Sequence, residues 1–218
     1  MDIRFHSEVN IPVGKIMLKG ELFIPGKANS IVVFSHGSGS SRLSKRNREV
    51  ARSLQEKKFG TLLFDLLTEE EDQHYHNRFD IGLLTKRLAA ATEWLDEHPA
   101  AKSCGIGYFG ASTGAASALR AAAILPQIQA VVSRGGRPDL AMDDLDEVEA
   151  PTLLLVGSLD YDVLLLNKQA YIQLNCEKKL EIIEGATHLF EEPGMMKKVC
   201  ESAGEWFKKY LHPVVVTK

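Results

Sequence analysis

A Gly-x-Ser-x-Gly motif between an apolar run and an alanine-rich run constrains this chain more than any other feature. The motif is Gly-Ala-Ser-Thr-Gly at residues 110–114, directly after the apolar residues 104–109. This order predicts a strand, a sharp turn and a helix, with Ser112 in a strained backbone conformation. Gly110 and Gly114 would let the strand and the helix approach closely, because neither carries a side chain. The helix N-terminus would then face any anionic oxygen formed beside the Ser112 hydroxyl.

The same stretch also contains Gly-x-Gly-x-x-Gly, at Gly105–Gly110, which resembles a dinucleotide-binding motif. That motif requires its glycines in the turn after a strand, and an acidic residue about 20 positions later. Here the glycines fall within the expected strand, and no Asp or Glu occurs between Ser112 and Pro138. The context therefore argues against dinucleotide binding.

The composition narrows the class of protein. The chain has 218 residues, 44% of them hydrophobic and 25% charged, with a net charge of −3. We expect one domain over residues 1–218, as a monomer or a homodimer, with no nucleic acid and no membrane among its partners. No signal-peptide core or transmembrane run is apparent. Three cysteines without paired spacing indicate free thiols and a cytoplasmic location.

Apolar runs alternate with helical patterns from Ile31 onward, which predicts a three-layered α/β fold with a mostly parallel sheet. The acidic residues 69–72 are expected to form a loop. We expect an antiparallel opening at 3–11 and 15–24. Buried strands are expected at 31–34, 61–64 and 152–156, and further strands at 104–109, 128–132 and 179–183. Helices are expected at about 43–58, 80–97, 112–125, 163–174 and 193–210.

Three candidate catalytic residues each follow an apolar run by a few positions: Ser112, Asp160 and His188. Parallel sheets bring such positions together at the carboxyl ends of their strands. A serine hydroxyl needs a base to take its proton and a third group to orient that base, and these residue types supply both. Their order along the chain is the one expected of an α/β-hydrolase. Asp162 is the alternative acid, although its position suits the N-terminus of the following helix.

An acyl-transfer reaction also needs donors for the oxyanion that forms on the attacked carbonyl. We expect one donor to be the backbone N–H of Thr113, the residue after the nucleophile. The second should come from the loop at 36–41, where Ser38 is the preferred residue and Gly39 lies behind it.

At this point the chain resembles a small α/β-hydrolase of the dienelactone-hydrolase-like group, related to stand-alone or phosphoribosyltransferase-fused hydrolases. The matching segments are residues 36–42, 64–68, 107–114, 133–139, 157–160 and 186–193. The resemblance implies a twisted sheet of about eight strands with an antiparallel second strand and little or no cap. Dienelactone hydrolases proper carry a cysteine nucleophile where this chain has Ser112, so lactone cleavage of their type is not implied. No phosphoribosyltransferase segment is expected within these residues.

The sequence leaves three functions open. The first is a serine esterase that cleaves a small ester, or a lactone or thioester, through an acyl-serine intermediate without metal or organic cofactor. The others are a non-catalytic binding or regulatory protein on a hydrolase scaffold, and an acyltransferase. A metal site at Asp72, His74 and His76 is conceivable, but a solvated loop explains them better because no further ligand has a suitable spacing.

Four arginines are expected at the same sheet edge as Ser112: Arg42, Arg46, Arg134 and Arg137. Guanidinium groups bind carboxylate or phosphate groups through paired hydrogen bonds. One interpretation is that Arg134 or Arg137, in the turn after a strand, binds an anionic group of the substrate. The other is that the arginines pair with nearby aspartates, namely Asp139, Asp143 or Asp144, and order the loops.

Overall fold

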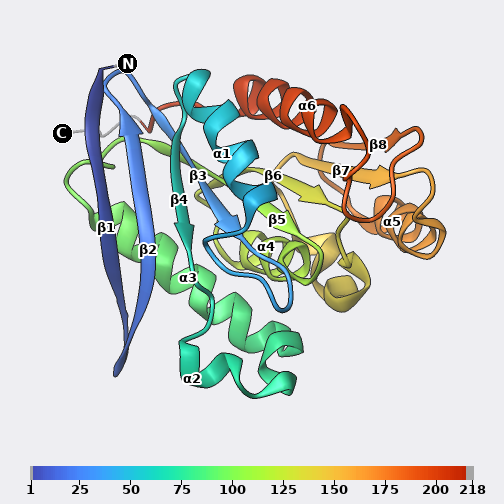
Figure 1. Ribbon diagram of the computed structural model, residues 1–218, viewed down its shortest axis with the longest axis horizontal. Helices are drawn as coiled ribbons and strands as arrows, with labels where there is room; N and C mark the ends of the chain where they lie inside the picture. The colour runs from blue at the N-terminus through green and yellow to red at the C-terminus, as the bar shows by residue number, and fades with distance from the viewer. Residues whose placement is uncertain (1, 215–218) are drawn as a thin grey trace.

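An eight-stranded sheet forms the centre of the computed structural model, which describes residues 2–214 (Figure 1). Its strands are β1 (Ile3–Val13), β2 (Ile16–Pro25), β3 (Ser30–Ser35), β4 (Gly60–Phe64), β5 (Gly105–Ala111), β6 (Ile128–Arg134), β7 (Thr152–Gly157) and β8 (Lys178–Ile183). They lie in the order β1-β2-β4-β3-β5-β6-β7-β8. Strand β2 is antiparallel to β1 and β4, and all pairs from β4 to β8 are parallel. The expected α/β-hydrolase sheet, with its antiparallel second strand, is confirmed.

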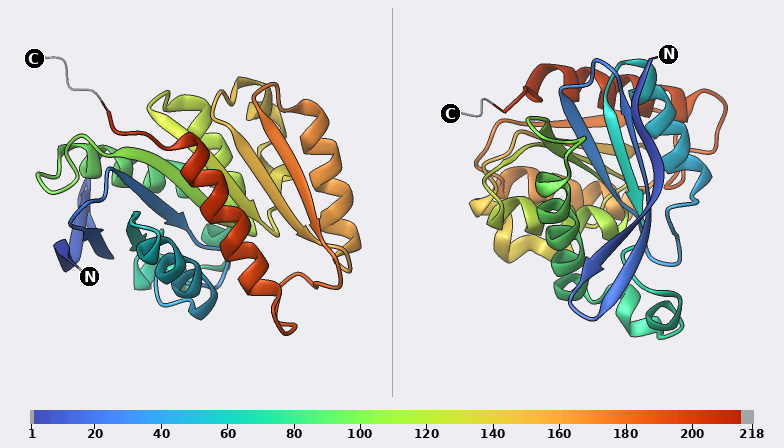
Figure 2. Two further views of the ribbon diagram at one scale, coloured as in Figure 1. Left: turned by 90° about the horizontal axis from the view of Figure 1, so that it is seen from above. Right: turned by 90° about the vertical axis from the view of Figure 1, so that its left-hand side faces the viewer.

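Helices cover both faces of the sheet (Figure 2). On one face lie α1 (Lys45–Glu56) and α6 (Met195–Tyr210); on the other lie α3 (Ile81–Glu97), α4 (Thr113–Ile124) and α5 (Tyr161–Gln173). Each face has its own hydrophobic cluster, and all six residues of β3 are buried between them. Covering a parallel sheet on both sides explains why its central strands read as unbroken apolar runs.

One expected loop is wrong: residues 69–72 form the short helix α2 (Glu69–Asp72). The cause is a capping box, in which the Thr68 hydroxyl accepts from the Glu71 N–H and the Glu71 carboxylate accepts from the Thr68 N–H. The remaining short elements are the 3₁₀ segments η1 (Tyr75–Phe79) and η2 (Pro138–Glu147). The segment between β4 and α3 thus contains α2 and η1, and the segment between β6 and β7 contains η2.

Strand β6 is longer than the expected 128–132 and includes Ser133 and Arg134. Both residues continue the parallel register, since Arg134 lies opposite Ala111 of β5 and Leu155 of β7. Arg134 was expected in a turn, and this correction changes its surroundings. Its backbone is fixed between two strands, and its side chain is buried rather than solvated.

Two further observations concern the whole of the described chain. None of the helices within residues 2–214 is long and apolar enough to cross a membrane. The three cysteines, Cys104, Cys176 and Cys200, are free, as their spacing predicted.

The close approach of β3 to the start of α4 generates a stability prediction at Gly114. A Cβ at this position would collide with the carbonyl oxygens of Ser35 and His36. We expect Gly114→Ala to lower the free energy of unfolding by about 1–3 kcal/mol, as overpacking does elsewhere, measured by urea denaturation. In the control Gly82→Ala, the added Cβ would contact only the Asp80 side chain, at 3.3 Å. Stability there should change by no more than about 1 kcal/mol, and equal losses in both variants would contradict this account.

Candidate active site

Ser112 occupies the sharp turn between β5 and α4 with φ 52° and ψ −123°. A positive φ is unfavourable for a residue with a side chain and persists only where neighbours enforce it. Gly37 is one such neighbour, because a Cβ on it would lie 3.1 Å from the Ser112 Cβ. The turn predicted from the Gly-x-Ser-x-Gly motif is therefore present, with the serine at its tip.

Backbone hydrogen bonds fix this turn to the next strand. The Ser112 N–H donates to the Arg134 carbonyl at 3.2 Å, and the Arg137 N–H donates to the Ser112 carbonyl at 3.1 Å. The Ser112 carbonyl also accepts from the Ala115 N–H at 3.1 Å, within the first turn of α4. The backbone of the strained residue is thus hydrogen-bonded through both its N–H and its carbonyl, which fixes the position of the turn.

Asp160 and His188 meet above the ends of β7 and β8. The loops that carry them are bonded to each other, since the Leu159 N–H donates to the Ala186 carbonyl at 3.0 Å. His188 Nδ1 lies 2.6 Å from Asp160 Oδ2. This contact places the ring proton on Nδ1 and leaves Nε2 free to accept a proton. The carboxylate is the more buried partner, with 14% of its side chain exposed against 37% for His188.

All three predicted residues line one cleft, which has two lobes. The first, which we call the apolar lobe, has a volume of about 480 Å³. The second, the polar lobe, has a volume of about 270 Å³. Ser112 and His188 line both lobes, and Asp160 lines the apolar one. The apolar lobe takes its name from Val163 and Leu166, residues that the sequence analysis did not single out.

The two candidate acids differ in what they contact. Asp160 occupies the N-cap position of α5 but makes no capping hydrogen bond with its side chain, because that side chain is directed to His188. Asp162 lies in the first turn of α5, where a negative charge suits the helix dipole. The structure thus pairs His188 with Asp160, the residue preferred from the sequence, and leaves Asp162 in the helix, as expected.

Thr113 and Ser38, the expected oxyanion donors, are in direct contact. The Ser38 N–H donates to the Thr113 side-chain oxygen at 2.8 Å. This hydroxyl was not anticipated as a partner, because nothing in the sequence indicates that the two loops meet. It holds the Ser38 N–H beside Thr113, and an incoming oxyanion would have to share that donor or displace the hydroxyl from it.

His36 shapes the loop that carries Ser38. Its Nε2 accepts from the Leu66 N–H at 3.0 Å, so the proton must lie on Nδ1, which donates to the Gly37 carbonyl at 3.0 Å. Burial lowers the pKa of His36 below its ordinary value, because the charged ring would be desolvated. His36 is therefore neutral and acts in the positioning of this loop.

The four arginines of this edge fall into two groups. Three are paired: Arg42 with Asp65 at 3.0 Å, Arg46 with Glu191 at 2.9 Å, and Arg137 with Asp139 at 2.7 and 2.8 Å. For Arg137 this is the loop-ordering role given as one interpretation, although it also lines the apolar lobe. Arg134 has no hydrogen bond or ion pair from its side chain within the described residues.

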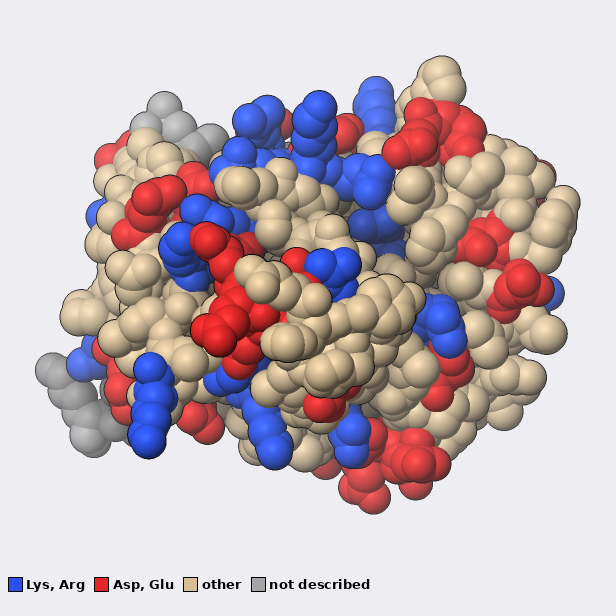
Figure 3. Space-filling view, turned by 60° about the horizontal axis from the view of Figure 1, so that its bottom comes forward, with Lys and Arg blue, Asp and Glu red and all other residues tan. Residues whose placement is uncertain are grey.

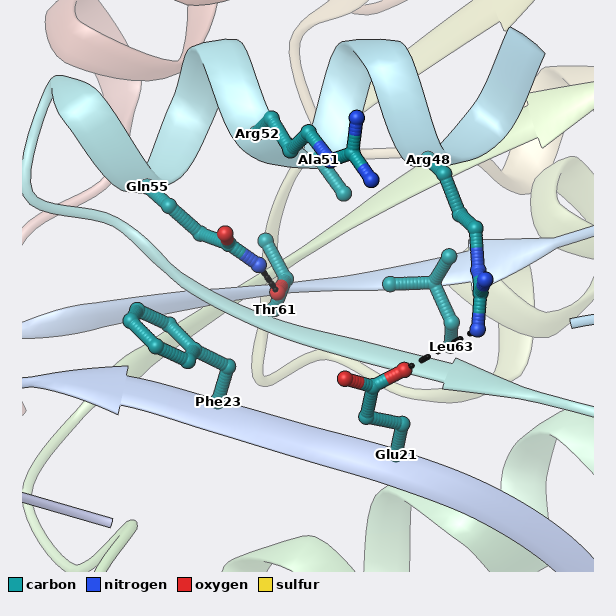
Figure 4. A pocket seen from close by; sticks show the side chains of 8 residues that line it. All are labelled: Glu21, Phe23, Arg48, Ala51, Arg52, Gln55, Thr61 and Leu63. Atoms are coloured by element: carbon teal, nitrogen blue, oxygen red, sulfur yellow. Dashed lines mark hydrogen bonds and ion pairs between the residues drawn. The ribbon is translucent and has the colours of Figure 1, made fainter. Parts of the chain in front are cut away.

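Charged side chains and possible metal ligands also lie outside the cleft. Basic and acidic side chains are interspersed over the face shown in Figure 3, rather than forming one field of either sign. Across residues 2–214, no three His, Cys, Asp or Glu side chains are placed to hold a metal ion. A separate hollow between α1 and the antiparallel strands contains Arg48 and Arg52 (Figure 4). There Arg48 pairs with Glu21 at 3.4 Å.

Comparisons with known proteins identify the family and the fold of the chain. A family model described as the dienelactone hydrolase family matches residues 18–211. The crystal structure of a dienelactone hydrolase from Anabaena variabilis is 52% identical, with a TM-score of 0.94 over 97% of this chain and 100% of that one. Two less similar structures share the fold. Est1E from Butyrivibrio proteoclasticus is 17% identical, with a TM-score of 0.78 over 93% of this chain and 98% of that one. An esterase from Pyrococcus furiosus is 18% identical, with a TM-score of 0.81 over 95% of this chain and 92% of that one.

Two curated proteins from strains of Mycobacterium tuberculosis, provisionally named phosphoribosyl transferases, are also similar. Each is 52% identical over 206 residues, which is 94% of this chain but 46% of theirs. The chain thus spans about half the length of these relatives.

The buried neutral state of His36 predicts a pH-dependent stability. Its pKa in the folded protein lies below the ordinary value of 6.5, so the unfolded chain takes up the proton first as the pH falls. The free energy of unfolding should be highest above about pH 6.5 and fall below it, by at most about 1.4 kcal/mol per pH unit. Urea denaturation between about pH 8 and pH 5 would measure this slope.

His36→Gln is the matching variant, because glutamine cannot take up a proton in this range. We expect a smaller slope for His36→Gln than for the wild type. His98, whose pKa burial also lowers, is present in both proteins and contributes equally. Identical slopes would show that His36 does not titrate as its surroundings imply.

Proposed function

Since the chain belongs to the dienelactone hydrolase family and is a hydrolase of the α/β type, we propose that it is a serine hydrolase that cleaves small esters through an acyl-serine intermediate. The observation that carries this proposal is the shared cleft of Ser112, Asp160 and His188. In it, the serine has a strained backbone, and the histidine ring is bonded to a carboxylate at 2.6 Å. These are the parts that nucleophilic catalysis by serine requires.

Each residue has one role in the proposed reaction. Ser112 Oγ attacks the carbonyl carbon of the ester while His188 Nε2 takes the hydroxyl proton. Asp160 holds the ring through Nδ1 and stabilises the imidazolium that forms. The leaving alcohol receives the proton from His188, and a water molecule then repeats the sequence on the acyl-serine. No step needs a metal or an organic cofactor.

Backbone donors stabilise the oxyanion in this proposal. The Thr113 N–H lies at the first residue of α4, where the helix dipole also favours negative charge. The Ser38 N–H is the second donor in this proposal, and the oxyanion must share it with the Thr113 hydroxyl or displace that hydroxyl from it. Loss of one such donor costs about 3–4 kcal/mol of transition-state stabilisation in other hydrolases.

The cleft favours short acyl groups. Val163 and Leu166 are the apolar side chains that line its apolar lobe, and Arg137 and Asp162 also line it, so the lobe offers little apolar surface to a long hydrocarbon. The exposed His188 ring also leaves the intermediate open to water, which favours hydrolysis over transfer to another acceptor.

The central test is Ser112→Ala, assayed with p-nitrophenyl esters of increasing acyl length. We expect kcat to fall by at least about 10⁴-fold, because the nucleophile is removed, with an unchanged urea midpoint. A fluorophosphonate probe should label the wild type at Ser112 and leave the variant unlabelled. An unlabelled wild-type protein would instead indicate a non-catalytic scaffold, and near-normal turnover by the variant would exclude Ser112 as the nucleophile.

The two aspartates provide a second test with a built-in control. Asp160→Asn should lower kcat by about 10⁴-fold, because the amide would stabilise the wrong tautomer of His188. Asp162→Asn should reduce stability by no more than about 1 kcal/mol, through a weaker helix N-terminus. The reverse pattern would identify Asp162 as the acid.

A further inference from the structure

We propose that Arg134, with Arg46 beside it, forms an anion-binding subsite in the polar lobe that receives a carboxylate or phosphate group of the substrate. This inference rests on the proposed function and specifies the substrate class. It also separates Arg134 from Arg137, its neighbour in the sequence, whose guanidinium is bound to Asp139.

The first argument is that Arg134 is a buried cation without a counter-charge. Only 5% of the residue is exposed, and its Nε is fully buried without a hydrogen-bond partner among the described residues. Its guanidinium lies over the Phe190 ring, whose centroid is 5.8 Å from Cζ. Burial lowers the pKa of Arg134 to about 10, so it still carries its charge at neutral pH. An unpaired buried charge is costly, and a bound anion would offset that cost.

The second argument is that two arginines border the same lobe. Arg46 and Arg134 both line it, together with Ser112 and His188. The Nε of each is buried without a hydrogen-bond partner in the described part of the chain. These Nε atoms are covered by protein, so the terminal nitrogens of the two guanidinium groups are the donors that we propose for an anionic oxygen group in the lobe.

The third argument is the position of Arg134 relative to the nucleophile. Its carbonyl accepts the Ser112 N–H at 3.2 Å, so Ser112, in the turn directly after β5, lies beside the end of β6. Both residues also line the polar lobe, so an anion bound there by Arg134 would belong to the same small molecule as the ester carbonyl. The apolar lobe, on the other side of Ser112 and His188, remains available for the uncharged part of the substrate.

The fourth argument is that neighbouring arginines are already neutralised. Arg42 and Arg137 each contact a carboxylate, and so does Arg48 in the hollow of Figure 4. Among the described residues Arg46 has one ion-pair partner, Glu191, whose side chain is 65% exposed and which does not line the polar lobe. The lobe is thus lined by two guanidinium groups, only one of which has a carboxylate partner, and this leaves one positive charge for a ligand to neutralise.

Three esters with the same alkyl chain test the proposal: p-nitrophenyl pentanoate, the mono-p-nitrophenyl ester of adipic acid, and p-nitrophenyl 5-phosphonopentanoate. We expect the wild type to prefer an anionic ester over the neutral one in kcat/KM. Arg134→Gln should lower that preference by about 10- to 100-fold, the effect of losing charge-assisted hydrogen bonds. Arg134→Lys should restore part of it, because lysine keeps the charge but not the paired geometry.

Arg46→Gln is the second variant, which keeps the proposal testable if Arg134→Gln does not fold; it should also reduce the preference. Arg52→Gln, in the separate hollow of Figure 4, is the matched control and should leave the preference unchanged. The ratio between the adipate and phosphonate esters distinguishes a carboxylate site from a phosphate site. Equal rates on neutral and anionic esters in the wild type, or an equal loss on all three in Arg134→Gln, would overturn the proposal.

A binding experiment separates this inference from the proposed function. Calorimetric titration of Ser112→Ala with monomethyl adipate and with methyl pentanoate measures recognition of the anion without turnover. We expect tighter binding of monomethyl adipate, and loss of that difference when Arg134→Gln is added. Anion binding without fluorophosphonate labelling of the wild type would retain the subsite and reject the hydrolase mechanism. Fluorophosphonate labelling of the wild type without any preference for the anion would retain the hydrolase mechanism and reject the subsite.

Discussion

The positive φ of Ser112 is the constraint on which the rest of this structure depends. A serine in that conformation costs about 1–3 kcal/mol of backbone strain, so its neighbours must leave no alternative. Gly114 allows α4 to approach β3, and the hydrogen bonds between Ser112, Arg134 and Arg137 join the turn to β6. The parallel sheet then brings Asp160 and His188 to the same edge. These contacts together hold Ser112 at the carboxyl edge of the sheet.

The titratable residues around the cleft differ in whether their side chains have partners. His36 is neutral, and its two ring nitrogens are used to fix the loop of Ser38. Asp160 has a partner in His188. Arg134 alone among these buried titratable groups has neither a hydrogen bond nor an opposite charge from the described residues. This contrast is the basis for the proposal that Arg134 recognises a charged group of the substrate.

The sequence was sufficient for features that depend on local patterns. Apolar runs located the strands, and the positions of Ser112, Asp160 and His188 just after such runs placed them at one edge. It was insufficient where distant segments decide the outcome. Arg134 belongs to β6 because β5 and β7 pair with it, and neither pairing is encoded near residue 134. Likewise, the bond from Ser38 to Thr113 joins two loops far apart in the chain.

The hydrogen bond between Ser112 and Arg134 has an evolutionary consequence, because it uses only main-chain atoms. Any residue at position 134 could accept the serine N–H equally well, so mutation there can alter the side chain without moving the nucleophile. During evolution, the side chain at position 134 can therefore change, and with it the preferred ligand, while Ser112 keeps its position. The same separation makes position 134 a natural starting point for directed evolution of selectivity.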